Sequence, residues 1–399
     1  MEWKEVTLGE VSSKIGDGLH GTPKYDDEGS YYFINGNNLN CGKIIIKDDT
    51  KRVGIEEFVK NQKELNEQTI LVSINGTIGN VAKYNNEPCI LGKSACYINV
   101  VKEVDKEFIY YVLTSANFKR NITNEATGTT IKNVSLKQMR EYKFNIPCNI
   151  SDQRRIASIL SSLDRKIELN NKINADLEEM AQAIFKNWFV DFEPFKDGKF
   201  VDSELGMIPE GWKVGTLGDI TKNKFAKVKE RNDVKVLSPV TTGELVLSEE
   251  YFTKQVFSSS IAKYKIVNKG DFAYNPARVN IGSLGRNEFD FDGCVSPVYV
   301  VFSVLDGYEN YFDLFRKTDF FKDSVASLAI GGVRQSLSYD DLSSIEVIIP
   351  SENAVEEFNN LYNQMKKTIK ANKLENSRLS LLRDTLLPRL MSGELEVPE

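Results

Sequence analysis

Residues of the kinds that build common catalytic centres are scarce in this sequence. The chain of 399 residues contains one histidine, His20, and five cysteines, none of which belongs to a Cys-x-x-Cys pair. Zinc sites made of Cys and His need several such ligands at short spacings, and a hydrolytic triad would have to depend on His20. We therefore expect no metal and no catalytic centre on this chain, and we interpret the cysteines as reduced, mostly buried thiols.

Segments that resemble cofactor-binding loops are incomplete. Residues 91–94 read LGKS, like the end of a phosphate-binding loop, but Glu87 stands where that loop needs a glycine. Residues 275–278 read NPAR, which resembles the Asn-Pro-Pro-aromatic tetrapeptide of amino-methyltransferases. The second proline and the aromatic that would stack on a flipped base are missing. We predict no cofactor on this chain.

Long apolar runs are absent as well. None approaches the ~20 residues of a membrane span, and residues 1–10 lack the pattern of a signal peptide. We expect a cytoplasmic protein without a membrane partner. The net charge of −6 argues mildly against a nucleic-acid partner, because phosphate binding needs positive charge.

Positive charge is nevertheless concentrated in two segments. Residues 110–143 and residues 222–235 each contain six basic side chains against two acidic ones. The basic residues are Lys119, Arg120, Lys132, Lys137, Arg140 and Lys143, and then Lys222, Lys224, Lys227, Lys229, Arg231 and Lys235. On charge alone, a solvated charged surface is the favoured explanation of each segment.

Residues 151–189 contain neither proline nor glycine and predict one long helix. Ser151 and Asp152 are the expected N-cap residues. Apolar positions recur with the period of 3.5 residues that is typical of a coiled coil, so a helix of roughly 55 Å would need a partner helix. The predicted seam is Ile156, Leu160, Leu163, Ile167, Asn170, Asn174, Leu177, Ala181, Ile184 and Trp188. An ordinary core helix with two tolerated asparagines is the alternative.

A second helix is predicted from residue 358 onward, with Pro388 ending it. Its seam is Phe358, Tyr362, Met365, Ile369, Asn372, Asn376, Leu379, Leu382 and Leu386. Asn372 and Asn376 follow Asn170 and Asn174 by 202 residues, so antiparallel packing would bring the two polar breaks together. A buried asparagine fixes the register of a coiled coil because a slipped register leaves its amide unpaired.

The whole sequence repeats itself at a distance of 202 to 209 residues, since Trp3 is matched by Trp212 and Gly79 by Gly282. We predict a globular unit (1–150), a helix (151–190), a second unit with its leading linker (191–350), and a second helix with a tail (351–399). Short β-branched and aromatic runs with few helices indicate the α+β class for each unit. Antiparallel helices would place the units at the ends of a rod with pseudo-twofold symmetry, which suits a bipartite target such as two DNA half-sites.

Polar loops are the remaining candidates for a binding site. Arg, Lys, Asn and Gln are the side chains that read base edges in the major groove of DNA. In the first unit the candidates are His20, Thr22, Lys24, Asn75, Thr77, Thr129, Thr130 and Lys132. In the second unit they are Asn275, Arg278, Asn280, Arg334 and Gln335. The alternative is that they are ordinary loop residues.

Three segments resemble a known family. Residues 153–195 (QRRIASILSSLDRKIELNNKINADLEEMAQAIFKNWFVDFEPF) closely resemble the central conserved region of type I restriction-modification specificity subunits. Residues 383–395 (RDTLLPRLMSGEL) are similar to their distal conserved region, and residues 16–25 (GDGLHGTPKY) to the opening of a target-recognition domain. The resemblance covers essentially the whole chain.

The resemblance implies a non-catalytic subunit with two target-recognition domains, each binding one half of a split DNA sequence. The conserved helices would set the spacer and dock two methylation subunits, which carry S-adenosylmethionine and methylate adenine N6. Restriction subunits, which use ATP and magnesium, can join them. For docking we predict Ile184, Trp188, Phe189, Leu386 and Leu390, with the coiled-coil core as the alternative role of these residues.

Two other functions remain open from the residues alone. A coiled-coil adaptor whose two heads bind proteins would have no affinity for DNA. A methyltransferase or nuclease with a degenerate motif would bind S-adenosylmethionine or a metal. The basic segments and the missing cofactor loop favour the DNA-binding subunit.

Overall fold

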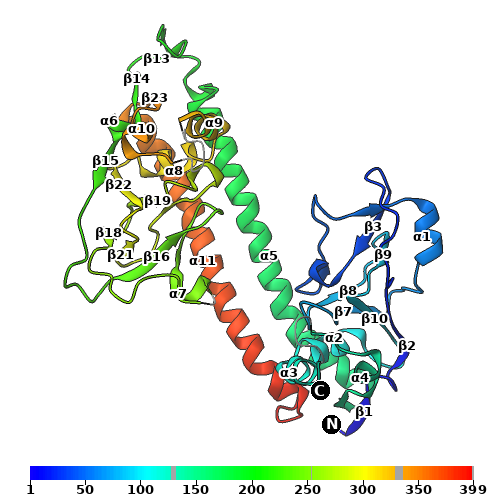
Figure 1. Cartoon of the computed structure of the whole chain (residues 1–399). Coiled ribbons are helices and arrows are strands. Elements are labelled where there is room, and N and C mark those ends of the chain that lie inside the picture. The colour runs from blue at the N-terminus through cyan, green and yellow to red at the C-terminus, as the bar shows by residue number, and fades with distance from the viewer. Residues whose placement is uncertain (127–131, 253, 329–335, 398–399) are drawn as a thin grey trace. The chain divides into compact units, whose positions relative to one another are not determined.

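The computed structural model describes residues 1–126, 132–252, 254–328 and 336–397. The chain divides into two compact units (Figure 1). Unit 1 comprises residues 1–171 and 372–399, and unit 2 comprises residues 172–371. The helices α5 (Ile150–Phe189) and α11 (Glu352–Met391) are each 40 residues long, and each contributes one half to unit 1 and the other half to unit 2.

Unit 1 is built on a four-stranded antiparallel sheet. Its order is β2 (Ser12–Asp17), β10 (Ala95–Val100), β7 (Thr69–Ser73), β8 (Val81–Lys83). Every residue of β7 and β10 is buried, because both faces of these two strands are covered. The other strands form smaller sheets: β1 (Trp3–Thr7) with β11 (Lys143–Pro147), β6 (Arg52–Val53) with β3 (Tyr31–Ile34) and β9 (Cys89–Leu91), and β4 (Leu39–Asn40) with β5 (Lys43–Ile44).

Unit 2 repeats this topology. Its four-stranded sheet has the order β15 (Thr221–Lys224), β22 (Val300–Val304), β19 (Phe272–Tyr274), β20 (Leu284–Arg286), and β14 (Lys213–Thr216) pairs with β23 (Glu346–Ile349). A further sheet has the order β17 (Leu245–Leu247), β16 (Lys235–Pro239), β21 (Gly293–Val295), β18 (Lys265–Val267). Its parallel pair, β16 with β21, corresponds to β3 with β9 in unit 1. The α+β class and the internal repeat are therefore confirmed. A hairpin of β12 (Phe200–Val201) and β13 (Ile208–Pro209) leads into the unit.

The helices of the two units also correspond. Unit 1 contains α2 (Lys106–Thr114), α3 (Ala116–Glu125) and α4 (Leu136–Glu141), and unit 2 contains α8 (Glu309–Phe315), α9 (Asp319–Leu328) and α10 (Tyr339–Ser343). Shorter elements are η1 (Gly36–Asn38), α1 (Ile55–Asn61), η2 (Glu193–Phe195), α6 (Leu217–Ile220), α7 (Ser248–Tyr251) and η3 (Val279–Ile281). Ser115 separates α2 from α3, because its hydroxyl accepts a hydrogen bond from the Phe118 N–H (3.2 Å) and caps a new helix.

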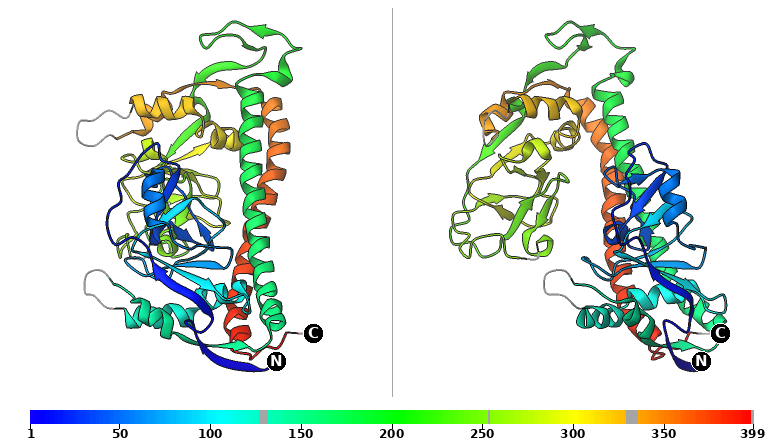
Figure 2. Two further views of the ribbon diagram at one scale, coloured as in Figure 1. Left: turned by 90° about the vertical axis from the view of Figure 1, so that its right-hand side faces the viewer. Right: turned by 45° about the vertical axis from the view of Figure 1, so that its right-hand side comes forward.

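Within each unit, the halves of α5 and α11 lie side by side and antiparallel (Figures 1 and 2). In unit 1, Arg383 donates to Asp164 (2.7 Å) and Lys166 pairs with Glu375 (3.3 Å). In unit 2, the ring of Phe358 packs against Phe185 and Phe189, with centroids 6.2 and 5.0 Å away. Residue numbers rise along one helix while they fall along the other, so the predicted antiparallel pairing is confirmed.

Three details of the long helices differ from the sequence predictions. The α5 helix begins at Ile150, and the side chain of Asn149, not that of Ser151 or Asp152, accepts the first free N–H, from Ser151 (2.9 Å). Pro388 lies inside α11, which continues to Met391. Its missing N–H removes one hydrogen bond, and burial of Leu387 and Leu390 in the core of unit 1 holds the last turn in place.

The seam of α11 also differs at one position. Leu382 is 46% exposed, so its predicted place in the seam is wrong. Arg383 faces α5 instead, because its guanidinium pairs with Asp164. An ion pair has thus replaced an apolar contact at this level of the helix pair.

The two ends of the described chain meet in unit 1 (Figure 2). The amino group of Met1 lies 3.7 Å from the Glu396 carboxylate, and Leu395 and Val397 pack against the same core as Trp3. The C-terminal segment therefore adds Leu395 and Val397 to the side chains that pack against the core of unit 1. Among the described residues, no helix has the length and apolar character of a membrane span.

Candidate nucleic-acid interface

The turn between β7 and β8 in unit 1 lies beside the segment that precedes α4. The Val134 N–H donates to the Ile74 carbonyl (2.9 Å), and the Gly76 N–H donates to the Lys132 carbonyl (3.2 Å). Gly76 has a φ of +74°, a left-handed conformation that suits glycine. The Asn75 amide donates to the Asn133 side chain (3.1 Å), which fixes the turn to its neighbour.

Three predicted binding residues therefore share one surface of unit 1. Asn75 is half-buried, whereas Thr77 and Lys132 are exposed. The predicted residues Thr129 and Thr130 lie outside the described residues.

Unit 2 contains the equivalent turn, between β19 and β20. The Leu337 N–H donates to the Pro276 carbonyl (3.1 Å), as Val134 does to Ile74 in unit 1. The Arg278 carbonyl accepts from the N–H groups of Ile281 (3.2 Å) and Ser283 (3.1 Å), so the backbone of the turn is fixed. The Arg278 side chain is exposed and forms no ion pair with a described residue.

Asn275 and Asn280 flank this arginine. The Asn275 side-chain oxygen accepts the Ala277 N–H (3.1 Å), and Asn280 is exposed. The structure thus brings together three of the five predicted residues of unit 2. Arg334 and Gln335 lie outside the described part of the chain.

A second exposed group in unit 1 follows β2. His20 pairs with Asp17 (2.6 Å), and Thr22 and Lys24 are exposed. The Leu19 N–H donates to the Leu91 carbonyl (2.7 Å), which fixes the start of this loop against the end of β9.

Lys93 was not among the predicted binding residues. It is exposed in the turn between β9 and β10, and the next carbonyl, that of Ser94, accepts the Ile74 N–H (3.0 Å). The Lys93 turn is therefore in contact both with the loop of His20 and with the turn of Asn75. The sequence did contain a signal for this lysine, which is the Gly-Lys-Ser tripeptide at residues 92–94. A turn of this kind exposes its lysine even when it is not part of a phosphate-binding loop.

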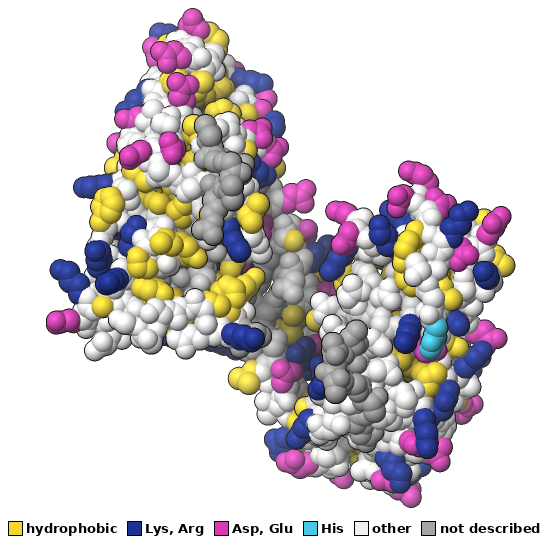
Figure 3. Space-filling view, viewed as in Figure 1, with side chains coloured by type: hydrophobic (Ala, Val, Ile, Leu, Met, Phe, Trp, Pro, Cys, Tyr) yellow, Lys and Arg dark blue, Asp and Glu magenta, His cyan; other side chains and the backbone are white. Residues whose placement is uncertain are grey.

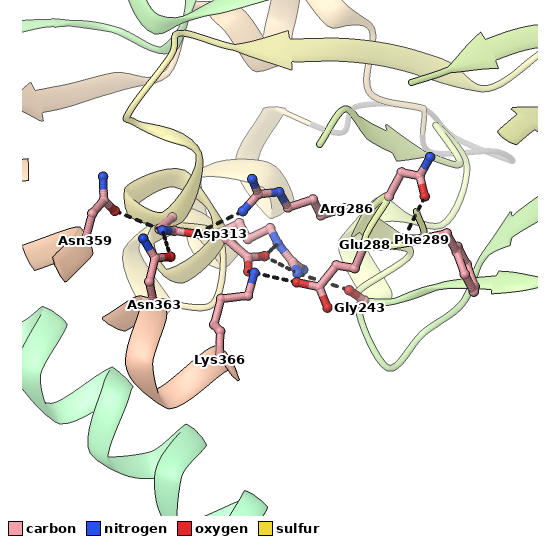
Figure 4. A network of polar contacts seen from close by, with 11 residues as sticks. Gly243, Arg286, Glu288, Phe289, Asp313, Asn359, Asn363 and Lys366 are labelled. Carbon is pink, nitrogen blue, oxygen red and sulfur yellow. Dashed lines mark hydrogen bonds and ion pairs between the residues drawn. The ribbon is translucent and has the colours of Figure 1, made fainter. Parts of the chain in front are cut away.

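A polar network centred on the buried Asp313 connects the loop of Gly243 and the residues around β20 to α11 (Figure 4). Arg316 donates to the carbonyls of Leu284 (2.8 Å), where β20 begins, and Gly243 (3.1 Å), and it pairs with Asp313 (2.6 Å). Lys366 of α11 lies between Glu288 (2.5 Å) and Asp313 (3.9 Å).

The helix α8, which carries Asp313, also contributes Asn310 to this network. The Asn310 amide nitrogen donates to the side chains of Asn359 and Asn363 on α11 (2.9 Å each), and its oxygen accepts from Arg286 at the end of β20 (2.9 Å). Because both strand and helix are bonded to α8, the network fixes the end of β20 relative to the helix.

The predicted register residues lie inside the helix pair. Asn170 is fully buried, and its amide nitrogen donates to Asn376 (2.9 Å) and Glu375 (2.7 Å) of unit 1. Its side-chain oxygen is buried without a hydrogen-bond partner. Asn174 is buried in unit 2, and Asn372 is half-buried in unit 1.

The residues predicted to dock other subunits lie mostly against the cores. Phe189 and Leu390 are buried in the cores of unit 2 and unit 1, whereas Ile184, Trp188 and Leu386 are half-buried and pack against them. Phe189 and Leu390 are therefore core residues, which was the alternative to the predicted docking role. Each long helix packs against the core of its unit and buries these side chains there. The exposed apolar side chains of the two helices are Leu169, Ile173, Met180, Leu361, Leu374, Leu381 and Leu382.

Three of the five cysteines are buried, and two are exposed. Burial raises the pKa of Cys89 to about 12 and that of Cys294 to about 11, and Cys96 is also buried, whereas Cys41 and Cys148 are exposed. In the described ranges, no three His, Cys, Asp or Glu side chains cluster as a metal site would require. Basic and acidic side chains are interspersed over both units (Figure 3).

Two repeated α+β units, each with an exposed polar turn at the same place in its sheet, and an antiparallel helix pair define a protein with two similar candidate binding surfaces. Residues 1–179 match the family described as "Type I restriction modification DNA specificity domain". The chain is 29% identical to the type I restriction enzyme MjaIX specificity subunit of Methanocaldococcus jannaschii, over 95% of this chain and 87% of that one. It is 24% identical to the HindI specificity subunit of Haemophilus influenzae, over 72% of this chain and 77% of that one.

The fold is also similar to a solved structure, the type I restriction-modification S subunit from M. genitalium. The TM-score is 0.59 at 20% identity, over 98% of this chain and 96% of that one. Over nearly its whole length, the chain is thus similar to type I restriction-modification specificity subunits.

Proposed function

We propose that this chain is the DNA-binding specificity subunit of a type I restriction-modification complex, in which each unit recognises one half of a bipartite DNA sequence. The observation that carries the proposal is the repetition of one exposed polar turn, at β7–β8 in unit 1 and at β19–β20 in unit 2. A protein that reads two half-sites needs one such reading surface in each unit.

The geometry of the turns suits the reading of base edges. Arg and Asn side chains recognise guanine and adenine by paired hydrogen bonds, and such contacts gain affinity when their backbone is fixed in advance. The Arg278 turn has this property, because its own backbone hydrogen bonds and the Arg316 network hold it. We propose Asn75, Thr77, Lys132, Asn275, Arg278 and Asn280 as the described residues that face DNA, together with His20, Thr22 and Lys24 of the neighbouring loop.

The helix pair would set the spacer between the half-sites. The hydrogen bond from the Asn170 side-chain amide to Asn376 permits one register of α5 against α11, so the pair is suited to fix a length. In this proposal the chain carries no catalytic centre and docks two methylation subunits, which bind S-adenosylmethionine and methylate adenine N6. Restriction subunits that use ATP and magnesium can join, and the complex works in the cytoplasm, where the DNA is.

The deciding experiment maps methylated adenines across the genome in cells with and without the gene. Deletion should remove methylation at one bipartite sequence and leave other methylated sequences unchanged. The methylation subunit must be shown to be present and active in the deletion strain by supplying the gene again. An unchanged map under those conditions would replace the proposal by that of a protein-binding adaptor.

A variant tests the turn itself. We expect Arg278→Ala, purified with the methylation subunits, to weaken binding to the specific duplex by about 1–3 kcal/mol, because one base-edge contact is lost. Binding to a duplex of unrelated sequence should change much less. Arg378→Ala is the matched control, since Arg378 is an exposed arginine on α11. Equal losses for both variants would show that the turn of Arg278 contributes only general charge.

A further inference from the structure

Two segments that are far apart in the sequence form a short ribbon in unit 2. Residues 226–229 run antiparallel to residues 262–266, with Lys227 opposite Lys265. The Val228 N–H donates to the Tyr264 carbonyl (2.9 Å), and the Ile266 N–H donates to the Ala226 carbonyl (2.8 Å). The ribbon therefore brings two lysine-containing segments together.

The two faces of this ribbon differ sharply in character. Val228 and Tyr264 are buried in a small apolar cluster on the inner face. Side chains alternate between the faces of an extended chain, and residues directly opposite each other share a face. Lys227 and Lys265 therefore share the outer face. Lys229, which has a φ of +55°, and Lys263 are exposed in the turns at the end of the ribbon, and we count them with this outer face.

Two other basic residues of the segment 222–235, Lys224 and Arg231, are paired with carboxylates. Lys224 pairs with the buried Asp271 (2.7 Å), so its charge is neutralised inside the unit. Arg231 is held in the same way by Asp233 (2.6 Å) and Asp292 (3.0 Å).

The lysines of the outer face have no such partners. Lys227, Lys229 and Lys263 are exposed and form no ion pair with a described residue. Burial and the positive charge of Lys227 both lower the pKa of Lys265, which donates to the Tyr299 carbonyl (2.7 Å). The acidic residue next to these lysines in the sequence is Glu230, which is exposed. The face therefore carries a positive charge that the unit itself does not balance.

An aromatic side chain lies at the edge of the same face. Phe225 is 68% exposed, and Lys265 lies over its ring, 6.0 Å from the centroid. Figure 3 shows Lys and Arg side chains gathered at the margin of unit 2, below the position of β18 and β21 in Figure 1. In a chain with a net charge of −6, such a concentration is the feature that attracts a polyanion.

The place of the ribbon in the repeat adds a second, independent argument. Residues 225–229 follow β15, and residues 18–24 follow β2, the corresponding strand of unit 1. The loop after β2 contains His20, Thr22 and Lys24, which are exposed beside the turn of Lys93. The lysine ribbon is thus the unit 2 counterpart of a loop that unit 1 presents beside its polar turn.

We infer that the outer face of Lys227, Lys229, Lys263 and Lys265 is a contact surface for the phosphate backbone of duplex DNA. It supplies affinity that does not depend on base sequence and complements the reading of bases by the Arg278 turn. The inference rests on the proposed function, because it names a further contact with the same DNA.

The test uses the full-length chain purified with its methylation subunits. Affinities for a specific and an unrelated duplex of equal length are measured at several salt concentrations, for the wild type and for Lys227→Ala/Lys229→Ala/Lys263→Ala. Each lost phosphate contact lowers the slope of log affinity against log salt by about 0.9, so the slope should fall by about 2.7. At about 0.1 M salt the affinity for both duplexes should fall roughly a hundredfold or more.

Two further variants make the result specific. The triple variant with arginine at the same three positions keeps the charge and should retain the wild-type slope. Lys199→Ala/Lys213→Ala/Lys367→Ala removes the same charge from exposed positions outside the ribbon and should change neither slope nor affinity.

The outcomes separate this inference from the proposed function. If the wild-type complex binds the specific duplex but the ribbon variant matches it in slope and affinity, the ribbon does not contact DNA. If the variant keeps its DNA affinity but loses its methylation subunits, the ribbon is a protein interface and the inference is overturned. If the wild-type complex shows no affinity for any duplex, the proposed function fails and this inference fails with it.

Discussion

Replacing Asp313 by asparagine should loosen the Arg278 turn from α11 without changing the shape of the side chain. Asp313 is 5% exposed and pairs with Arg316, which in turn donates to the Leu284 carbonyl at the end of the turn. The substitution leaves the charge of Arg316 buried without its carboxylate. Breaking a buried ion pair in this way costs about 3–5 kcal/mol, far more than loss of a surface pair.

The dependence of stability on pH gives a second, independent value for the contribution of the Asp313 carboxylate. Burial alone would raise the pKa of Asp313, but the charges of Arg316, Lys366 and Lys317 outweigh it and lower the pKa from 3.8 to about 2. A carboxyl with a depressed pKa stabilises the folded state above its unfolded pKa, and this contribution is lost as the pH falls through the folded value. It amounts to roughly 2 kcal/mol, which should disappear between about pH 4 and pH 2.

Hydrogen exchange measured by mass spectrometry can report the loss of local stability around Asp313. Peptides that cover α8 and β20 should exchange about 10² to 10⁴ times faster in Asp313→Asn than in the wild type at pH 7, because 3–5 kcal/mol corresponds to that range of opening constants. Urea unfolding of both proteins at pH 7 and near pH 3 should show the difference between them shrinking by roughly 1 kcal/mol, because about half of the contribution is still present at pH 3.

The matched control is Asp319→Asn in the same unit. Asp319 also pairs with a basic residue three positions later, Lys322 (3.0 Å), but it is 92% exposed, so we expect less than about 1 kcal/mol. Equal exchange rates for the Asp313 and Asp319 variants would refute the reasoning. So would a stability difference between Asp313→Asn and wild type that does not change with pH.

Two further variants test the attachment of the helices in unit 1. Tyr111→Phe removes the hydrogen bond from the Tyr111 hydroxyl to Asp164 (2.7 Å), and urea unfolding should show a loss of about 1.5–3 kcal/mol, as for bonds to charged groups. Asn170→Leu alone should cost about 1–3 kcal/mol because the side-chain oxygen of Asn376 loses its donor, whereas Asn170→Leu/Asn376→Leu should melt above the single variant. The double variant should also methylate sites whose spacer differs by one base pair, and methylation confined to the original spacer would contradict a role of the asparagines in register.

Features with a local period were predicted well from the sequence. The seam from Ile156 to Asn174 follows from the 3.5-residue spacing of apolar side chains, because each buried position is set by the helix itself. The α+β repeat was predicted from matched tryptophans, glycines and prolines, since these residues mark turns and strand ends in both units.

Features that depend on contacts between distant segments were not predicted. The basic character of residues 222–235 was visible, but the sequence does not show that Asp271 and Asp292 neutralise two of these residues, or that Lys263 lies beside Lys229. In the same way, the apolar character of Phe189 and Leu390 is equally compatible with a docking surface and with a core. Only the fold shows that the unit covers them.

The division of the chain between the units determines the order in which they are completed during synthesis. Unit 2 is one continuous stretch, residues 172–371, whereas unit 1 needs residues 372–397 in addition to residues 1–171. Leu387 and Leu390 fill part of the core of unit 1, so that core stays open while the whole of unit 2 leaves the ribosome. The unit that is translated first is therefore the one that is finished last, and a truncated message yields a complete unit 2 beside an unfinished unit 1.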